Sequence, residues 1–197
     1  MLLIGLCGGS GAGKGTVAEL FLKHGIPSID ADAVYRDLTA PGSRLPVIIS
    51  KMFGEQTLTP DGGLNRKKLA EIVFSDKEKL KNLNLITHAE IITETERRLK
   101  KYKAEGYPAL IFDAPQLFES GFNKRCDVII SVVAPLETRI ERLLSRDGIT
   151  EEAARKRISS QLSDDYIMER SDFVIVNDGD MEYLRQQTDE LVKILLK

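Results

Sequence analysis

Short apolar runs alternate with longer amphipathic segments along this chain. Five runs rich in branched residues have the length and composition of buried parallel strands. They are Leu2–Cys7, Ile26–Ile29, Ala109–Phe112, Val128–Val133 and Phe173–Val176. Helical patterns cover residues 14–23, much of 64–105, and then 136–146, 151–169 and 181–196. This alternation predicts an α/β protein with a parallel sheet and crossover helices.

The interval between the second and third predicted strands is far longer than one crossover helix. It contains the turn signals Ala40–Ser43 and Thr59–Gly63, and residues 64–105 are mostly helical and dense in Lys, Glu and Arg. An inserted helical substrate domain explains this interval. The alternative is a solvated helical hairpin that touches no ligand, and the sequence leaves both open.

A glycine-rich turn, Gly8–Thr16, follows the first predicted strand and precedes the first predicted helix. Glycines let backbone N–H groups converge on phosphate oxygens, and the helix N-terminus adds a positive dipole. Lys14 can reach the terminal phosphates of a nucleotide. We therefore interpret the turn as a phosphate-binding loop rather than a structural turn. Gly15 stands where the strict motif has Ser or Thr, so whether Thr16 alone supplies the hydroxyl near magnesium stays open.

Acidic residues end two of the predicted strands. Asp30 and Asp32 follow the second strand, and Asp113 ends the third. Ligands of open parallel sheets bind at the carboxyl ends of the strands, where a carboxylate can accept a proton or associate with magnesium. Asp30 or Asp32 can instead cap the next helix. The nearby phosphate loop favours the functional role.

Three arginines, Arg139, Arg142 and Arg146, are spaced to share one face of a predicted helix. Guanidinium groups neutralise charge on a transferring phosphoryl group, and Arg146 lies next to Gly148, where a flexible lid can begin. The alternative is a solvated helix whose acidic neighbours pair with the arginines, an interpretation that suits Arg139 in particular.

The composition of the chain argues against several classes of protein. The chain has 197 residues, 42% hydrophobic and 29% charged, with a net charge of −2, which argues against a nucleic-acid-binding face. Cys7 and Cys126, like His24 and His88, are too few and too far apart to indicate zinc or a disulfide framework. We expect a cytoplasmic protein without a membrane segment, since no signal-peptide pattern or long apolar run occurs.

Taken together, these motifs resemble the dephospho-CoA kinase family, which catalyses the last step of coenzyme A synthesis. The resemblance spans nearly the whole chain. Its carriers are Gly8–Ala18, Ile29–Asp32, Phe53-Gly54, Gly63–Arg66, Leu69, Val73-Phe74, His88, Asp113–Glu119, Arg142, Arg146-Asp147, Gln161 and Asn177–Gly179.

The resemblance implies a P-loop kinase fold with a five-stranded parallel sheet flanked by helices. It implies a core of about 1–38 and 107–197, a helical substrate-binding insertion of about 60–105 and a lid of about 139–165. It also implies ATP and Mg²⁺ as cofactors, transfer of the ATP γ-phosphate to the ribose 3′-hydroxyl of dephospho-CoA, and no obligate protein partner.

The resemblance also assigns roles by position. Lys14 becomes the phosphate clamp, Asp32 the base, Arg142 and Arg146 the lid arginines, and Asn177 part of the adenine-side loop. The implied nucleotide-binding residues are Gly11, Ala12, Gly13, Lys14, Gly15 and Thr16, with Thr16 also at the metal. The implied acceptor-side residues are Arg66, His88, Pro115, Phe118 and Glu119, together with Asp32.

The chain departs from the family pattern at Gly15, Asn65, Ala89, Gln116 and Arg139. The departures at 65, 89 and 116 concern the identity of the acceptor. A nucleoside monophosphate kinase shares the loop and the donor, but paired aspartates suit an alcohol acceptor better than a phosphate. A GTPase-type switch is disfavoured, because residues 123–126 lack the acid of the guanine motif and no DxxG sequence occurs.

Overall fold

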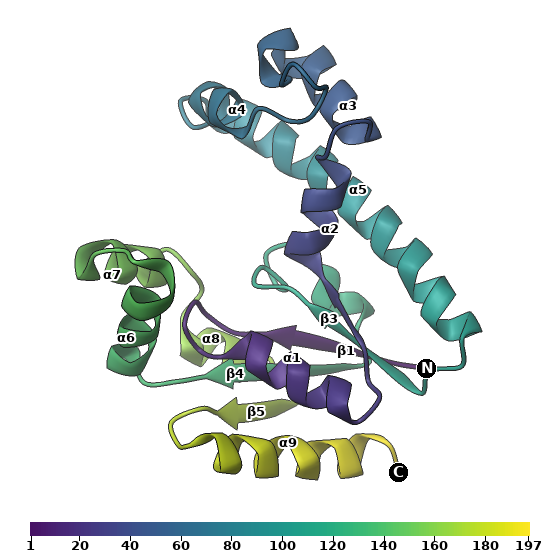
Figure 1. Cartoon of the computed structure of the whole chain (residues 1–197), viewed down its shortest axis with the longest axis vertical. Coiled ribbons are helices and arrows are strands. Elements are labelled where there is room, and N and C mark those ends of the chain that lie inside the picture. The colour runs from purple at the N-terminus through teal and green to yellow at the C-terminus, as the bar shows by residue number, and fades with distance from the viewer. The chain divides into compact units, whose positions relative to one another are not determined.

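The computed structural model describes all 197 residues (Figure 1). The strands are β1 (Leu2–Cys7), β2 (Ser28–Asp30), β3 (Ala109–Asp113), β4 (Val128–Val133) and β5 (Phe173–Val176). The helices are α1 (Lys14–Lys23), α2 (Ala31–Leu38), α3 (Arg44–Phe53), α4 (Arg66–Val73), α5 (Lys77–Ala104), α6 (Leu136–Asp147), α7 (Glu151–Ser159), α8 (Asp164–Met168) and α9 (Met181–Leu195). The chain divides into two compact units. The first comprises Met1–Ile29 with Tyr102–Lys197, and the second comprises Asp30–Lys101.

The first unit is built on a five-stranded parallel sheet in the order β2-β3-β1-β4-β5. β1 lies between β3 and β4, with Leu6 opposite Asp113 on one side and Ile130 on the other. The branched side chains of the central strands are buried, as expected for a sheet covered on both faces. The predicted α/β fold with a five-stranded parallel sheet is therefore confirmed.

The second strand, Ser28–Asp30, starts two residues later and ends one residue later than the predicted Ile26–Ile29. Ile26 is fully buried, but its N–H donates to the Phe21 carbonyl at the end of α1. Pro27 has no N–H to contribute to a strand. The ladder therefore starts at Ser28, although the Pro27 carbonyl still accepts from the Ile111 N–H.

Helices α1 and α9 pack together on the sheet (Figure 1). The buried face of α1 presents Val17, Ala18, Leu20 and Phe21 to the core. This i, i+3, i+4 spacing is the amphipathic pattern from which the helix over 14–23 was predicted, and the helix has those bounds.

The predicted single helix over 151–169 is wrong. It is two helices, α7 and α8, because the Ser163 hydroxyl accepts from the Tyr166 N–H and starts a new helix. Most of residues 64–105 is helical, as predicted, in two helices, α4 and α5. The Asp76 carboxylate accepts from the N–H groups of Glu78 and Lys79 at the start of α5.

The second unit has its own apolar core. Its members come from α3, α4, α5 and the segment before α4: Leu45, Ile49, Phe53, Leu64, Leu69, Val73 and Leu83. The unit thus includes α2 and α3, for which no helix was predicted, and begins at Asp30 rather than near residue 60. Its role in substrate binding stays a prediction.

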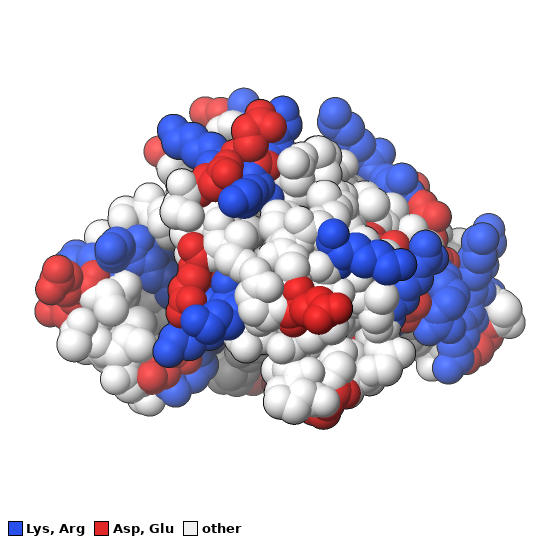
Figure 2. Space-filling model, turned by 90° about the horizontal axis from the view of Figure 1, so that it is seen from above, with Lys and Arg blue, Asp and Glu red and all other residues white.

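Charged side chains of both signs are interspersed on the surface in Figure 2, in keeping with a net charge of −2. Many form exposed ion pairs, such as Arg185 with Glu182 and Arg155 with Glu151. Such pairs contribute little to stability individually. None of the helices is both long enough and apolar enough to span a membrane.

Candidate active site

The glycine-rich loop runs from the end of β1 into the first turn of α1. Gly11 and Gly13 have φ angles of 80° and 96°, and Gly13 is the N-cap residue of α1. An added Cβ at Gly11 would lie 2.6 Å from the Arg139 carbonyl oxygen, and one at Gly13 would collide with Nδ2 of Asn177. Both positions therefore require glycine. The first turn of α1 has no acidic residue and no side-chain cap, so its first N–H groups are available to bind an anion.

Lys14 begins α1, and its ammonium forms an ion pair with the Asp113 carboxylate at the end of β3. The two side chains are only 15% and 11% exposed, so their charges interact in a largely desolvated environment. The structure thus brings together a lysine and an acid that the sequence placed in the same phosphate site.

Arg142 of α6 holds the loop from a second direction. One guanidinium nitrogen donates to the carbonyls of Gly11 and Ala12 at 3.2 and 3.4 Å, and the other donates to the carbonyl and Oδ1 of Asn177, both at 3.4 Å. The Asn177 side chain is buried and donates through Nδ2 to the Ala12 carbonyl at 2.8 Å. These segments, distant in sequence, therefore meet at one point of the loop.

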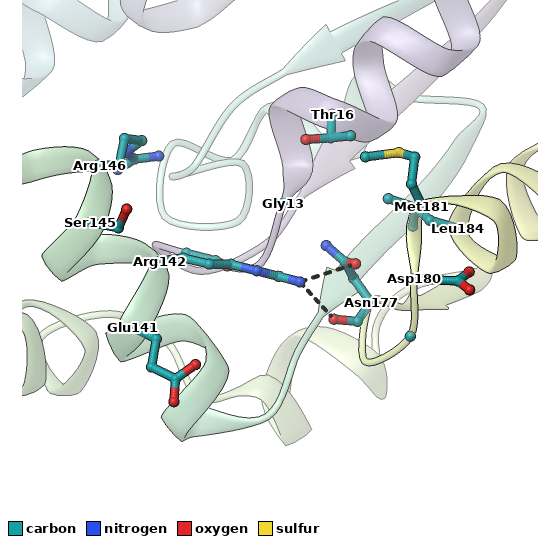
Figure 3. Close-up of a pocket in the computed structure, with 12 residues that line it drawn as sticks. Gly13, Thr16, Glu141, Arg142, Ser145, Arg146, Asn177, Asp180, Met181 and Leu184 are labelled. Carbon is teal, nitrogen blue, oxygen red and sulfur yellow. Dashed lines mark hydrogen bonds between the residues drawn. The ribbon is translucent and has the colours of Figure 1, made fainter.

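A cavity of about 610 Å³ opens beside this point (Figure 3). The volume suits a nucleotide-sized ligand. The predicted residues that line it are Gly11, Gly13, Thr16, Arg142, Arg146 and Asn177. Sequence reasoning missed the others, Glu141, Ser145, Gly179, Asp180, Met181 and Leu184. The available signal was their position next to Arg142 on α6 and just after Asn177.

Three further predicted residues, Ala12 and Gly15 of the loop and Arg146 of α6, differ in their environments. The side chain of Ala12 is fully buried, whereas Gly15 is exposed and an added Cβ there would meet nothing within 4 Å. Arg146 lies at the cavity with a side chain that is 62% exposed, and it donates to both carboxylate oxygens of Asp147. That hydrogen bond raises the pKa of Arg146 above its ordinary value.

The structure contradicts the interpretation of Arg139 as a solvated surface arginine. It is 4% exposed, its Nε donates to the Ser10 carbonyl at 2.9 Å, and its Nη1 donates to both carboxylate oxygens of Asp164 at 3.0 Å. The helical spacing alone could not show this, because its partners come from β1–α1 and α8.

A second cavity, of only about 10 Å³, lies at the start of the loop. Its predicted residues are Pro115, Phe118 and Glu119, and its other lining residues are Cys7, Gly8, Gly9, Gln161, Leu162 and Ile167. Gln161 accepts from the Ser10 N–H through Oε1 at 2.8 Å. Burial raises the pKa of the Cys7 thiol to about 11, so this thiol is protonated at neutral pH.

The two aspartates after β2 differ in their contacts. Asp30 is the N-cap residue of α2: its Oδ1 accepts from the Asp32 N–H at 2.8 Å and its Oδ2 from Arg36 at 3.4 Å. Asp32 is exposed in the first turn of α2, and its carboxylate forms no hydrogen bond. The capping role thus falls to Asp30.

The other two predicted acceptor-side residues lie on helices of the second unit. Arg66 begins α4, donates to the Thr39 hydroxyl at 3.1 Å and lies over the Tyr35 ring at 5.2 Å. Burial raises the pKa of Tyr35, and the Arg66 charge partly offsets this rise. His88 is half-buried on α5.

The profile of a protein family described as Dephospho-CoA kinase matches residues 2–182, nearly the whole chain. The chain belongs to the dephospho-CoA kinase family. The resemblance inferred from the sequence motifs is therefore confirmed, and with it the expectation of an ATP-dependent kinase.

Individual relatives agree with this membership. A dephospho-CoA kinase from Corynebacterium efficiens is 41% identical over 196 residues, covering 100% of this chain and 98% of the relative. The structure of a dephospho-CoA kinase from Campylobacter jejuni is 27% identical, with a TM-score of 0.72 over 98% of this chain and 96% of that one. Shikimate kinase from Acinetobacter baumannii has a TM-score of 0.53 over 100% of this chain and 93% of that one. At 16% identity, its similarity concerns the P-loop kinase fold alone.

Proposed function

We propose that this dephospho-CoA kinase family member transfers the γ-phosphoryl group of ATP to the ribose 3′-hydroxyl of dephospho-CoA, giving coenzyme A and ADP. The observation that carries the proposal is the cavity of about 610 Å³. There the phosphate loop, Arg142, Arg146 and Asn177 converge in a chain of this family. Phosphoryl transfer depends mainly on positioning and on neutralising phosphate charge, which is what these groups supply.

The donor side of the reaction uses the loop Gly11–Thr16. Its backbone N–H groups and the α1 dipole bind the phosphates, and Lys14 supplies the positive charge nearest the terminal phosphate. Arg142 and Arg146 neutralise charge on the transferring group, and Asn177 holds the loop on the adenine side. Lys14 already lies against Asp113, so nucleotide binding adds phosphate oxygens to an existing charge pair.

The chain offers oxygen ligands that suit Mg²⁺. The Thr16 hydroxyl lies at the cavity, and Asp113 supplies a carboxylate beside the loop. Mg²⁺ prefers hard oxygen donors and is commonly held by one or two side chains together with substrate phosphates. We propose Thr16 and Asp113 for this role, with Gly15 contributing no ligand. Bound there, the ion supplies charge neutralisation to the β- and γ-phosphates.

On the acceptor side, we propose Asp32 as the general base. Asp30 is committed to capping α2, whereas the carboxylate of Asp32 has no hydrogen bond and is free to accept a proton. Arg66, His88, Pro115, Phe118 and Glu119 are proposed to bind dephospho-CoA. The compact unit Asp30–Lys101 is then the substrate-binding unit, and residues from about 139 to 165 form the lid.

We also propose the cytoplasm as the location, because ATP is available there, and a chain that acts without an obligate protein partner. Fractionation of cells that express the tagged protein would test the location, and a membrane or secreted pool would contradict it. Turnover by the purified chain would test its independence of a partner.

An acceptor screen tests the proposed reaction. The purified protein is incubated with ATP and Mg²⁺, with dephospho-CoA, AMP, CMP or adenosine as acceptor, and ADP release is measured. We expect strong preference for dephospho-CoA and loss of turnover when EDTA removes the metal. Preference for AMP or CMP would reassign the protein to the nucleoside monophosphate kinases.

Two matched variants test the base. Single-turnover transfer is measured for Asp32→Asn and Asp30→Asn, with ATP affinity measured beside it. We expect Asp32→Asn to lose on the order of 10²–10⁴ in rate, the usual contribution of a general base, with ATP affinity retained. A loss confined to Asp30→Asn would move the base by two residues.

A further inference from the structure

The peptide group of Ser10, in the middle of the phosphate loop, is held from both ends by side chains outside the loop. Its N–H donates to Gln161 Oε1 at 2.8 Å, and its carbonyl accepts from Arg139 Nε at 2.9 Å. Within the loop itself, the Ala12 N–H donates to the Gly9 carbonyl, but no loop hydrogen bond involves Ser10. The orientation of this peptide group therefore depends on Arg139 and Gln161.

Arg139 reaches Ser10 only because the loop leaves room for it. A Cβ at Gly9 would collide with the Arg139 guanidinium, and a Cβ at Gly11 would lie 2.6 Å from the Arg139 carbonyl oxygen. The side chain is 5% exposed, and Asp164 is its one acidic partner, with both carboxylate oxygens 3.0 Å from Nη1. A buried cation is costly without such a counter-charge, so Asp164 determines where the guanidinium lies.

Both contacts to Ser10 depend on the same short segment. Gln161 lies two residues after the end of α7, and Asp164 is the first residue of α8. α7 itself packs on α6 through Ala154, Ile140 and Leu143. A shift of the segment after α7 therefore acts on the Ser10 N–H directly and on its carbonyl through Arg139.

We propose that Arg139 is a positioning residue for phosphoryl transfer. Held by Asp164, it fixes the Ser10 carbonyl while Gln161 fixes the N–H, so the conformation of the phosphate loop is coupled to the segment that follows the lid helix. This inference rests on the proposed function. A purely structural contact between α6 and α8 would instead stabilise the fold and leave kcat/KM for ATP unchanged.

Asp164→Asn and Asp165→Asn form the matched test. Both remove one negative charge from the first turn of α8, but Asp165 is exposed and does not contact Arg139. For Asp164→Asn we expect kcat/KM for ATP to fall on the order of 10–100-fold, because small misplacements of binding groups have effects of this size. We expect KM for dephospho-CoA to change less than twofold, and Asp165→Asn to behave as wild type.

Arg139→Lys gives an independent test. Lysine keeps the cation for Asp164, but a single ammonium cannot reproduce the fork that also reaches the Ser10 carbonyl. We expect a loss in kcat/KM for ATP similar to that of Asp164→Asn. Hydrogen–deuterium exchange should be faster in the peptide covering residues 8–16 of both variants, and unchanged in the peptide covering α9.

If Asp164→Asn and Arg139→Lys had a lowered unfolding temperature but an unchanged kcat/KM for ATP, the proposal would be overturned. Arg139 would then only stabilise the packing of α6 and α8. Equal kinetics for Asp164→Asn and Asp165→Asn would overturn it as well. Failure of the proposed function is distinguishable, because wild-type protein would then prefer another acceptor in the same assay. The comparison of ATP kinetics and loop exchange among the variants would still be valid.

Discussion

The two glycines that flank Lys14 should respond in opposite ways to substitution by alanine. Gly13 has a φ of 96°, and an added Cβ would displace the Asn177 amide that donates to the Ala12 carbonyl. Gly15 lies in the first turn of α1, and an added Cβ would meet nothing within 4 Å. Gly15→Ala is therefore a matched control for Gly13→Ala.

The expected magnitudes follow from these environments. A left-handed conformation costs a residue with a Cβ about 1–2 kcal/mol. Loss of the buried Asn177 hydrogen bond adds about 1 kcal/mol, so Gly13→Ala should lower the free energy of unfolding by about 2–3 kcal/mol. Gly15→Ala should raise it by up to about 1 kcal/mol, because alanine loses less backbone entropy in a helix. The two variants thus differ by about 2–4 kcal/mol, and at about 2–4 °C per kcal/mol for a chain of this size their unfolding temperatures should differ by roughly 4–16 °C.

Thermal unfolding followed by circular dichroism measures this difference, and titration with ATP measures its consequence for the site. We expect Gly13→Ala to lose ATP binding, since the loop and Asn177 separate, and Gly15→Ala to keep it. Equal unfolding temperatures for the two variants, or a Gly15→Ala protein less stable than wild type, would refute the reasoning.

Three further predictions concern charge and pH. Lys14→Ala should keep its circular dichroism spectrum and lose turnover on the order of 10²–10³-fold or more, so near-normal transfer would contradict the loop assignment. Arg146→Ala should lower kcat by roughly 10³-fold and change ATP affinity little. Weaker ATP binding at unchanged kcat would mean that Arg146 only binds phosphate in the ground state and does not stabilise the transition state. Burial raises the pKa of the Cys7 and Cys126 thiols from 9.0 to about 11 and about 12. Because the unfolded thiols ionise first, urea unfolding should show stability falling as the pH rises from 9 to 11, and a double alanine variant should lack this loss.

Local patterns were sufficient for the sheet and for the phosphate loop. The strands β1, β4 and β5 have the bounds that the apolar runs predicted. For β1 and β4 the reason is that a parallel strand buried on both faces is apolar along most of its length, whereas the edge strand β5 is apolar although Val174 and Val176 are partly exposed. The loop was recognisable because glycine, lysine and threonine must stand at fixed offsets between a strand and a helix. Where local capping competed with helical periodicity, as at Ser163, the pattern predicted one helix in place of two.

The sequence by itself determined the family, through motifs in a fixed order along nearly the whole chain, and the α/β class, through the alternation of apolar runs and helical patterns. The glycine-rich loop was recognisable for a different reason, because its residues are consecutive in the chain. Only the tertiary structure decided which side chains hold the loop. Arg139, Asp164 and Asn177 are far from Ser10 and Ala12 along the chain, and their hydrogen bonds exist only after β1, α6, α8 and the end of β5 have packed together. The same packing separated Asp30, which caps α2, from Asp32, whose carboxylate forms no hydrogen bond, although the sequence presents the two as equivalent acids at the end of one strand.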